Sequence, residues 1–201
     1  MSNGISSPAC FDKRGGNCWT GAYLSWLRGD IVLLSPTRKT LDLLLDQVDR
    51  LNRAKLEASR KVRALSKTPA YREDYSLLRS IPGVGEIVAM TLLTEICDID
   101  RFGNERQFAS YLGLVPTSRS SGEKTVHGEK TFRGNKELGP MMIESAWIAI
   151  TRDERLSASY TNYCRKMKPQ QAIVRVARQM SNIVFAVLKN KKKYVPCVSN
   201  G

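Results

Sequence analysis

A tight Pro-Gly-Val-Gly turn, from Pro82 to Gly85, is the part of this sequence best suited to binding an anion. Pro82 has no backbone N–H and disfavours helix in the residues before it, so a preceding helix is expected to end here. Gly83 and Gly85 accept backbone angles closed to other residues and leave room for a partner. The helix expected next begins with free N–H groups at the positive end of its dipole, which predicts an anion site.

The whole segment 77–96 resembles a helix-hairpin-helix, a module that grips the DNA backbone without reading its sequence. Apolar side chains are expected to clamp its two helices together. The alternative is an ordinary corner between helices, in which the glycines only permit tight packing. No strand leads into the turn, so a dinucleotide-binding fingerprint is not expected. The clamping side chains are Ile81, Val84, Ile87, Val88, Leu92 and Leu93.

A basic segment rich in small hydroxyl residues spans residues 116–135 and is expected to be irregular, with a short hairpin near residues 126–129. Such a composition suits phosphate contact, although a solvated loop would look the same. Its serines, glycines and cations include Ser118, Ser120, Ser121, Gly122, Gly128, Gly134, Arg119, Lys124, Lys130 and Arg133.

The acidic residues Glu95, Asp98 and Asp100 follow the second helix of the hairpin. Paired carboxylates can hold magnesium, but a polar turn that caps the next helix is the favoured interpretation. The single histidine, His127, and five irregularly spaced cysteines argue against a structural zinc site or a disulfide framework.

The charge balance favours a nucleic-acid partner. Lys and Arg number 32 against 19 for Asp and Glu, a net charge of +13 in 201 residues. No apolar run reaches the roughly 20 residues of a membrane span, and no secretory signal begins the chain. A reduced cytoplasmic, nucleoid-associated location without membrane contact is therefore expected.

The periodicity predicts a mainly α fold with a long coiled-coil-like helix and a compact helical domain. The expected parts are a disordered tail (1–17), a short helix plus coiled-coil-like linker (18–68), and a helical domain (69–195). Ser35 and Pro36 begin the long helix, whose apolar stripe suggests an oligomerisation arm over residues 36–66 or packing on its own domain. Further helices are expected at 104–112, 137–151 and 169–190.

Five motifs in order carry a family resemblance: Ile81-Pro-Gly-Val-Gly85, Asp98-Ile-Asp-Arg-Phe102, Tyr111-Leu-Gly-Leu-Val-Pro116, Ser120-Ser-Gly122 and Phe132-Arg-Gly-Asn135. Together they resemble the C-terminal transposase domain of the insertion-sequence one-hundred-and-ten family. These are the DEDD-plus-serine recombinases, related to the Piv-type invertases. The resemblance covers about residues 19–195.

The resemblance implies a serine that attacks a DNA phosphodiester and holds the strand as a phosphoserine. It maps to Ser121, which precedes a glycine, with Ser120 as second choice. It also implies DNA as a partner and, as in the better-studied members, a guide RNA. The expected DNA-binding residues are Gly83, Val84, Gly85, Arg119, Lys124, Lys130, Arg133 and Asn135.

Family members also carry an N-terminal RuvC-like domain with four acidic metal ligands, and no match to that domain is found in this sequence. No cofactor is therefore expected in this chain itself; Mg²⁺ is expected only with the RuvC-like domain, and the chain alone is expected to bind DNA without recombining it. Two alternatives remain. One is an inactive DNA- or RNA-binding regulator that binds a full-length transposase or its own copy through 36–66. The other is a repair or junction-processing factor that uses the same hairpin.

Overall fold

The computed structural model describes residues 20–29, 31, 35–115 and 135–197, which form eight α-helices, one 3-10 helix and no strand. The predicted mainly α fold is confirmed. The chain divides into two units, Met1–Ala58 and Ser59–Gly201. Within the described ranges, no helix is both long enough and apolar enough to cross a membrane.

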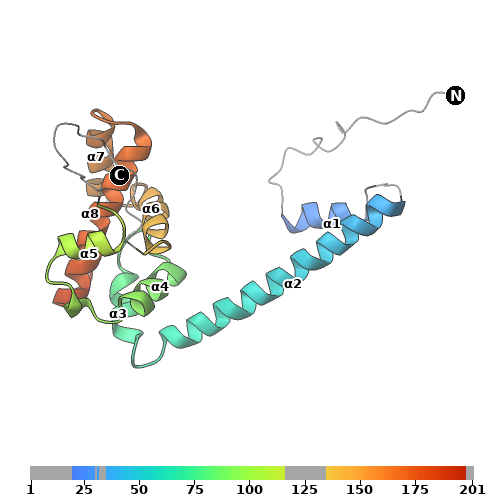
Figure 1. Ribbon diagram of the computed structural model, residues 1–201, viewed down its shortest axis with the longest axis horizontal. Helices are drawn as coiled ribbons and strands as arrows, with labels where there is room; N and C mark the ends of the chain where they lie inside the picture. The colour runs from blue at the N-terminus through green and yellow to red at the C-terminus, as the bar shows by residue number, and fades with distance from the viewer. Residues whose placement is uncertain (1–19, 30, 32–34, 116–134, 198–201) are drawn as a thin grey trace, which may run out of the picture. The chain divides into compact units, whose positions relative to one another are not determined.

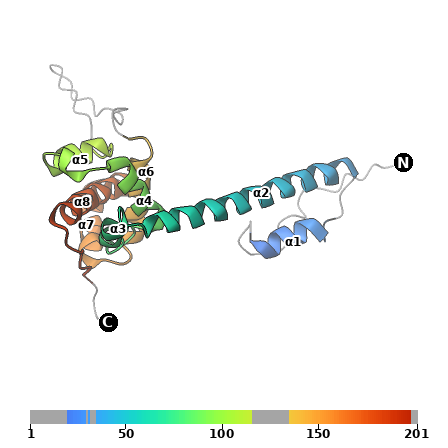
Figure 2. The same ribbon diagram turned by 90° about the horizontal axis from the view of Figure 1, so that it is seen from below.

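In the first unit, α1 (Gly21–Gly29) lies along the beginning of α2 (Ser35–Ser66), as Figures 1 and 2 show. Arg38 joins the two, since its guanidinium donates to the backbone carbonyls of Leu27, Arg28 and Ile31. Arg28 in turn forms an ion pair of 2.5 Å with Asp49. These bonds hold α1 against one side of α2.

The apolar stripe of α2 is only partly covered. Leu45 is 3% exposed, whereas Leu44 and Leu51 are each 60% exposed and Leu65 is 41% exposed. Leu44, Leu51 and Leu65 fall on one heptad position, with Ala58 between them, so the spacing is that of a coiled-coil seam. Pairing of this helix with another chain stays a prediction.

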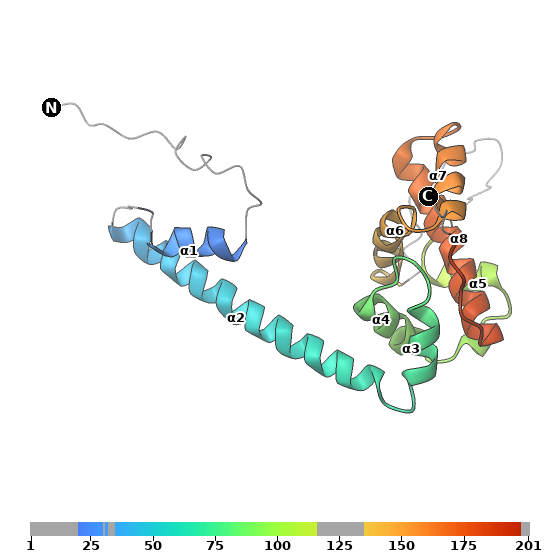
Figure 3. The same cartoon turned by 180° about the vertical axis from the view of Figure 1, so that it is seen from behind.

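The second unit is built around α8 (Pro169–Asn190), whose main contacts are with α3, η2, α5, α6 and α7 (Figure 3). Pro169 at the first turn suits the start of this helix, and Lys191, with a left-handed φ of 52°, ends it. Around it lie α3 (Arg72–Leu78), the 3-10 helix η2 (Ile99–Arg101), α5 (Glu105–Tyr111), α6 (Leu138–Ala149) and α7 (Glu154–Cys164). Helix α4 (Glu86–Ile96) packs against α3 and α6 instead.

The core of this unit is a continuous cluster of apolar side chains from all its helices. The largest side chains that are almost completely buried include Leu78, Ile81, Leu92, Phe108, Leu112, Leu138, Met142, Leu156, Met180 and Leu188. Because α8 contributes its whole apolar stripe, it is the main packing partner of α3, α5, α6 and α7, while α4 is held by α3 and α6.

Two features differ from the sequence-based expectation. Ile87, expected to clamp the hairpin, is 47% exposed, because it lies on the outer side of the first turn of α4. Helix α7 was not expected from the sequence at all. Asp153 begins it, since its side chain accepts hydrogen bonds from the backbone N–H groups of Arg155 and Leu156.

Candidate nucleic-acid interface

The predicted turn between the two helices of the hairpin is present and is held by its own backbone and by Arg79. The N–H of Val84 donates to the carbonyl of Ile81 at 3.1 Å, and Arg79 Nη1 donates to the carbonyl of Val84 at 2.8 Å. Gly85 is the N-cap of α4 in an extended conformation and provides no side-chain acceptor. The first N–H groups of α4 are therefore not capped by a side chain, as an anion site requires.

The two glycines of the turn have different surroundings. Gly83 has a φ of +82°, and a Cβ atom placed on it would lie 2.1 Å from the backbone oxygen of Ser145 in α6. Gly85 has no atom within 4 Å of the same position. Gly83 is thus required by the close packing of the turn on α6, while only Gly85 borders open space where a strand could approach. Val84 between them is 2% exposed and offers its backbone alone.

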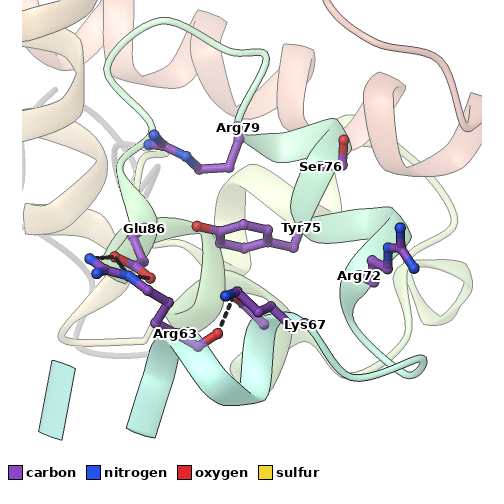
Figure 4. A pocket seen from close by; sticks show the side chains of 8 residues that line it. Arg63, Lys67, Arg72, Tyr75, Ser76, Arg79 and Glu86 are labelled. Carbon is purple, nitrogen blue, oxygen red and sulfur yellow. Dashed lines mark hydrogen bonds and ion pairs between the residues drawn. The ribbon is translucent and has the colours of Figure 1, made fainter. Parts of the chain in front are cut away.

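A cleft of about 790 Å³ lies beside this turn, between the end of α2, α3 and the start of α4. We call it the basic cleft, because four of its side chains are cations and one is a carboxylate. Figure 4 shows these side chains grouped around the ring of Tyr75. Its lining consists of Arg63, Ser66, Lys67, Arg72, Tyr75, Ser76, Arg79 and Glu86.

The single carboxylate of the basic cleft is already neutralised. Arg63 Nη2 lies 2.9 Å from Glu86 Oε2, and Arg63 Nε donates to the other oxygen at 3.0 Å. This bidentate interaction lowers the pKa of the Glu86 carboxyl and raises the pKa of the Arg63 guanidinium. Glu86 also opens α4, where the helix dipole favours a negative charge.

The serine-bearing segment lies outside the described residues, and so do Ser120, Ser121, Arg119, Lys124, Lys130, Arg133 and the expected hairpin near 126–129. Its two flanks are described and meet at one place. The N–H of Asn135 donates to the carbonyl of Tyr111 at 2.8 Å, and the N–H of Leu114 donates to that of Ala109 at 2.9 Å. The chain thus leaves and re-enters the fold beside the end of α5.

Asn135 itself holds this junction together. Its Nδ2 donates to Glu95 Oε2 at 2.6 Å, while its Oδ1 accepts from the N–H groups of Glu137 and Leu138 at the start of α6. The hydroxyl of Tyr111 adds a 2.9 Å bond to the carbonyl of Glu95. The side chain of Asn135 is thereby engaged inside the protein, joining the ends of α4 and α5 to the start of α6.

The acidic residues after α4 act as caps and ion-pair partners. Asp98 accepts from the N–H of Asp100 at the start of η2, and Asp100 lies 2.5 Å from Lys189 Nζ, which lowers the pKa of the Asp100 carboxyl. In the described part of the chain, no group of three His, Cys, Asp or Glu side chains could hold a metal ion. The interpretation as a capping turn is confirmed for Asp98.

The cations of the basic cleft were not singled out as a site from the sequence. Arg72 and Arg79 stand seven residues apart, two turns of α3, so they project on similar sides of that element. That spacing was a usable signal. Arg63 comes from the last turn of α2 and Lys67 directly follows that helix, and the bend at residues 67–71 brings them beside α3.

Comparisons with known proteins show which transposases this chain is similar to. The family described as "Transposase IS116/IS110/IS902 family" matches residues 75–161. An uncharacterized 43.6 kDa protein of insertion element IS110 from Streptomyces coelicolor is 37% identical over 59% of this chain and 29% of its own length. The transposase of IS1111A from Coxiella burnetii is 27% identical over 84% of this chain and 47% of its own.

A third relative extends the comparison beyond insertion sequences. The pilin gene-inverting protein of Moraxella bovis is 29% identical over 63% of this chain and 40% of its own length. The chain spans less than half the length of each of these three relatives. The resemblance carried by the five ordered motifs is confirmed, because residues 75–161 match the IS116/IS110/IS902 transposase family and its relatives align with most of the chain.

Proposed function

We propose that this chain is the DNA-binding, serine-bearing part of an insertion-sequence transposase. The match to this transposase family and to its relatives supports a role in transposition or recombination, with DNA as the partner. One observation carries the finer proposal: the flanks of the segment with Ser120 and Ser121 are fixed together at Asn135. A nucleophile must be held in register with its phosphorus atom, and rigid anchoring of its segment favours that.

In the proposed reaction, the Ser121 hydroxyl oxygen attacks a DNA phosphorus. A serine–phosphate bond forms, the bond from phosphorus to one deoxyribose oxygen breaks, and that oxygen leaves as a hydroxyl after taking up a proton. A later attack by a DNA hydroxyl on the phosphoserine reverses these changes and joins a new strand. Ser120 is the alternative nucleophile.

The chain's own cations stabilise the charge on the transferred phosphoryl group. Arg119, Lys124, Lys130 and Arg133 are proposed for this role, because positive charge is needed at the equatorial oxygens. Since a serine hydroxyl is a weak nucleophile, it also requires activation by a base or a metal ion. We propose that this activation comes from Mg²⁺ held by the RuvC-like domain that the resemblance implies.

DNA backbone contact is proposed at the start of α4. The N–H groups that follow Gly85 have no side-chain cap, and the chain carries a net charge of +13. Asn135, first expected to touch DNA, is better explained as a positioning residue, because its side-chain atoms already bond to Glu95 and to the start of α6. We also propose that the chain associates with the nucleoid, as a consequence of DNA binding.

Transfer of a labelled strand to the protein tests the nucleophile. The chain would be mixed with the RuvC-like domain of a longer relative, Mg²⁺ and radiolabelled DNA that carries element ends, and then separated on a denaturing gel. Wild type and Ser118→Ala should retain label on the protein, whereas Ser121→Ala should retain none. Label retained by Ser121→Ala, but lost in Ser120→Ala, would assign the role to Ser120; label retained by both would refute a nucleophile at this tandem.

A second function is favoured by the exposed leucines of α2. Leu44, Leu51 and Leu65 suit a regulator that pairs with a full-length transposase or with its own copy and blocks it. Sedimentation of the wild-type chain and of Leu51→Gln, whose side chain is exposed, tests self-association through α2. A dimer that Leu51→Gln abolishes supports the pairing helix, whereas a monomer at all concentrations argues against self-association.

A further inference from the structure

The basic cleft carries more positive charge than the carboxylate in its lining can neutralise. Its four cations, Arg63, Lys67, Arg72 and Arg79, face one carboxylate, Glu86. Arg63 is occupied by that carboxylate. The remaining three cations give the cleft a net charge of +3, counted from its five charged lining residues.

The other three cations of the cleft, Lys67, Arg72 and Arg79, are not paired with its carboxylate. Lys67 and Arg72 are exposed and form no ion pair with a carboxylate in the described ranges. Arg79 is held in place, because its Nη1 donates to the carbonyl of Val84 at 2.8 Å, and its other N–H groups stay available. A fixed guanidinium beside two unpaired cations is a preorganised site for an oxyanion.

The start of α4 adds a second, independent contribution. Glu86 lies at the first position of that helix and lines the cleft, so the positive end of the helix dipole is directed to the same place. The volume of about 790 Å³ is far larger than one phosphate group needs and suits a stretch of strand. Tyr75 and Ser76 offer a ring and a hydroxyl between the cations (Figure 4).

We propose that the basic cleft, whose lining residues belong to the segment 63–86, binds the phosphodiester backbone of a nucleic-acid strand. The choice of a nucleic acid as ligand rests on the proposed function, whereas the anion site itself rests on the cleft. Lys67, Arg72 and Arg79 contact phosphate oxygens. The ion pair between Glu86 and Arg63 neutralises the one carboxylate of the cleft, so that it repels a bound phosphate less.

The test measures binding of the 201-residue chain to fluorescein-labelled single-stranded DNA, RNA of the same sequence and duplex DNA, each roughly 20 nucleotides long. The double variant Lys67→Gln/Arg72→Gln removes two cleft charges. Arg165→Gln/Lys166→Gln is its control, since both residues are exposed at the end of α7, outside the cleft. Affinities are measured by fluorescence anisotropy across a salt series.

In Lys67→Gln/Arg72→Gln, the loss of two phosphate contacts should lower the slope of log affinity against log salt by about 1.8 on duplex DNA. At roughly 0.1 M salt, that change in slope corresponds to about a 60-fold loss of affinity. On a single strand the slope should fall by about 1.4. The control pair should change the slope much less. The nucleic acid on which the two variants differ identifies the strand that the cleft binds.

A second pair of variants predicts the opposite direction, which general damage to the fold would not produce. Glu86→Gln removes the one carboxylate of the cleft and frees Arg63, so binding should tighten several-fold. Glu105→Gln is matched to it, because Glu105 occupies the same first-turn position in α5. Only Glu86→Gln should tighten binding.

The outcomes separate this inference from the proposed function. If the cleft and control pairs weaken binding equally on all three nucleic acids, the cleft proposal is overturned while DNA binding elsewhere stands. If the wild-type chain shows no salt-dependent binding at all, both proposals fail.

Discussion

Gly83→Ala is predicted to be among the most damaging small substitutions in this chain. The added Cβ would lie 2.1 Å from the backbone oxygen of Ser145 and 3.1 Å from the backbone nitrogen of Ala149. A backbone atom cannot move aside by changing rotamer, so the turn must separate from α6, at a cost of about 1–3 kcal/mol. The left-handed φ of +82° adds about 1–2 kcal/mol for any residue with a Cβ.

The sum, about 2–5 kcal/mol, is a large share of the roughly 5–15 kcal/mol that stabilises a typical domain. Gly85→Ala is the matched control, two residues away in the same turn. Its φ of −78° suits alanine and its Cβ would meet no atom within 4 Å, so the substitution should cost at most about 1 kcal/mol, through the weaker preference for alanine at an N-cap.

Urea denaturation followed by far-UV circular dichroism measures both variants. The reasoning predicts a clearly lower midpoint for Gly83→Ala, and a near-native midpoint for Gly85→Ala. If the two variants lost the same stability, the packing of Gly83 on α6 would not be what the turn requires. Weaker nucleic-acid binding by the stable Gly85→Ala variant would in addition support strand contact at the start of α4.

Three further predictions concern the junctions of the second unit. Asn135→Ala should cost about 1–2 kcal/mol in urea denaturation through loss of the α6 cap. Asn135→Asp keeps that acceptor but places a second carboxylate against Glu95, so its urea midpoint should also fall. Asp153→Ala should cost about 2–3 kcal/mol, because a buried carboxylate that accepts four hydrogen bonds is removed; a loss below 1 kcal/mol would contradict this. Burial, with the Asp153 hydrogen bond, raises the pKa of Tyr194 to about 12, so the free energy of unfolding should fall as pH rises from about 10 to about 12, and Tyr194→Phe should lack this component in urea midpoints taken across that range.

The helices that sequence reasoning found were those with long, regular apolar patterns and clear end signals. The helix α8 was expected at 169–190 and spans Pro169–Asn190, because a proline begins it and its apolar stripe continues without interruption. The start of α2 at Ser35 and the break at residues 67–70 were likewise readable from local chemistry. Such signals act within a few residues and need no tertiary context.

The missed features depend on contacts between distant segments. Helix α7 has only Leu156 fully buried, so its pattern was weak, and the Asp153 cap was its main local signal. The exposure of Ile87 could not be read from the sequence, because it depends on which side of α4 meets α3 and α6. The engagement of Asn135 with Glu95, 40 residues apart, is of the same kind.

The candidate site divides in the same way. The Pro-Gly-Val-Gly turn was predicted where it lies, yet the different roles of Gly83 and Gly85 appear only when α6 is placed against the turn. The basic cleft was missed because its cations come from the end of α2, the bend that follows it and α3, which only the folded chain brings together.

Identification of the residue that becomes bonded to DNA tests the central claim most directly. After strand transfer under the conditions above, nuclease and protease digestion followed by tandem mass spectrometry would locate the nucleotide that remains on the protein. The account predicts a nucleotide linked through phosphate to the peptide that contains the Ser120–Ser121 tandem, on Ser121. A nucleotide attached to a tyrosine or to a serine elsewhere, or strand transfer with no covalent intermediate, would contradict it.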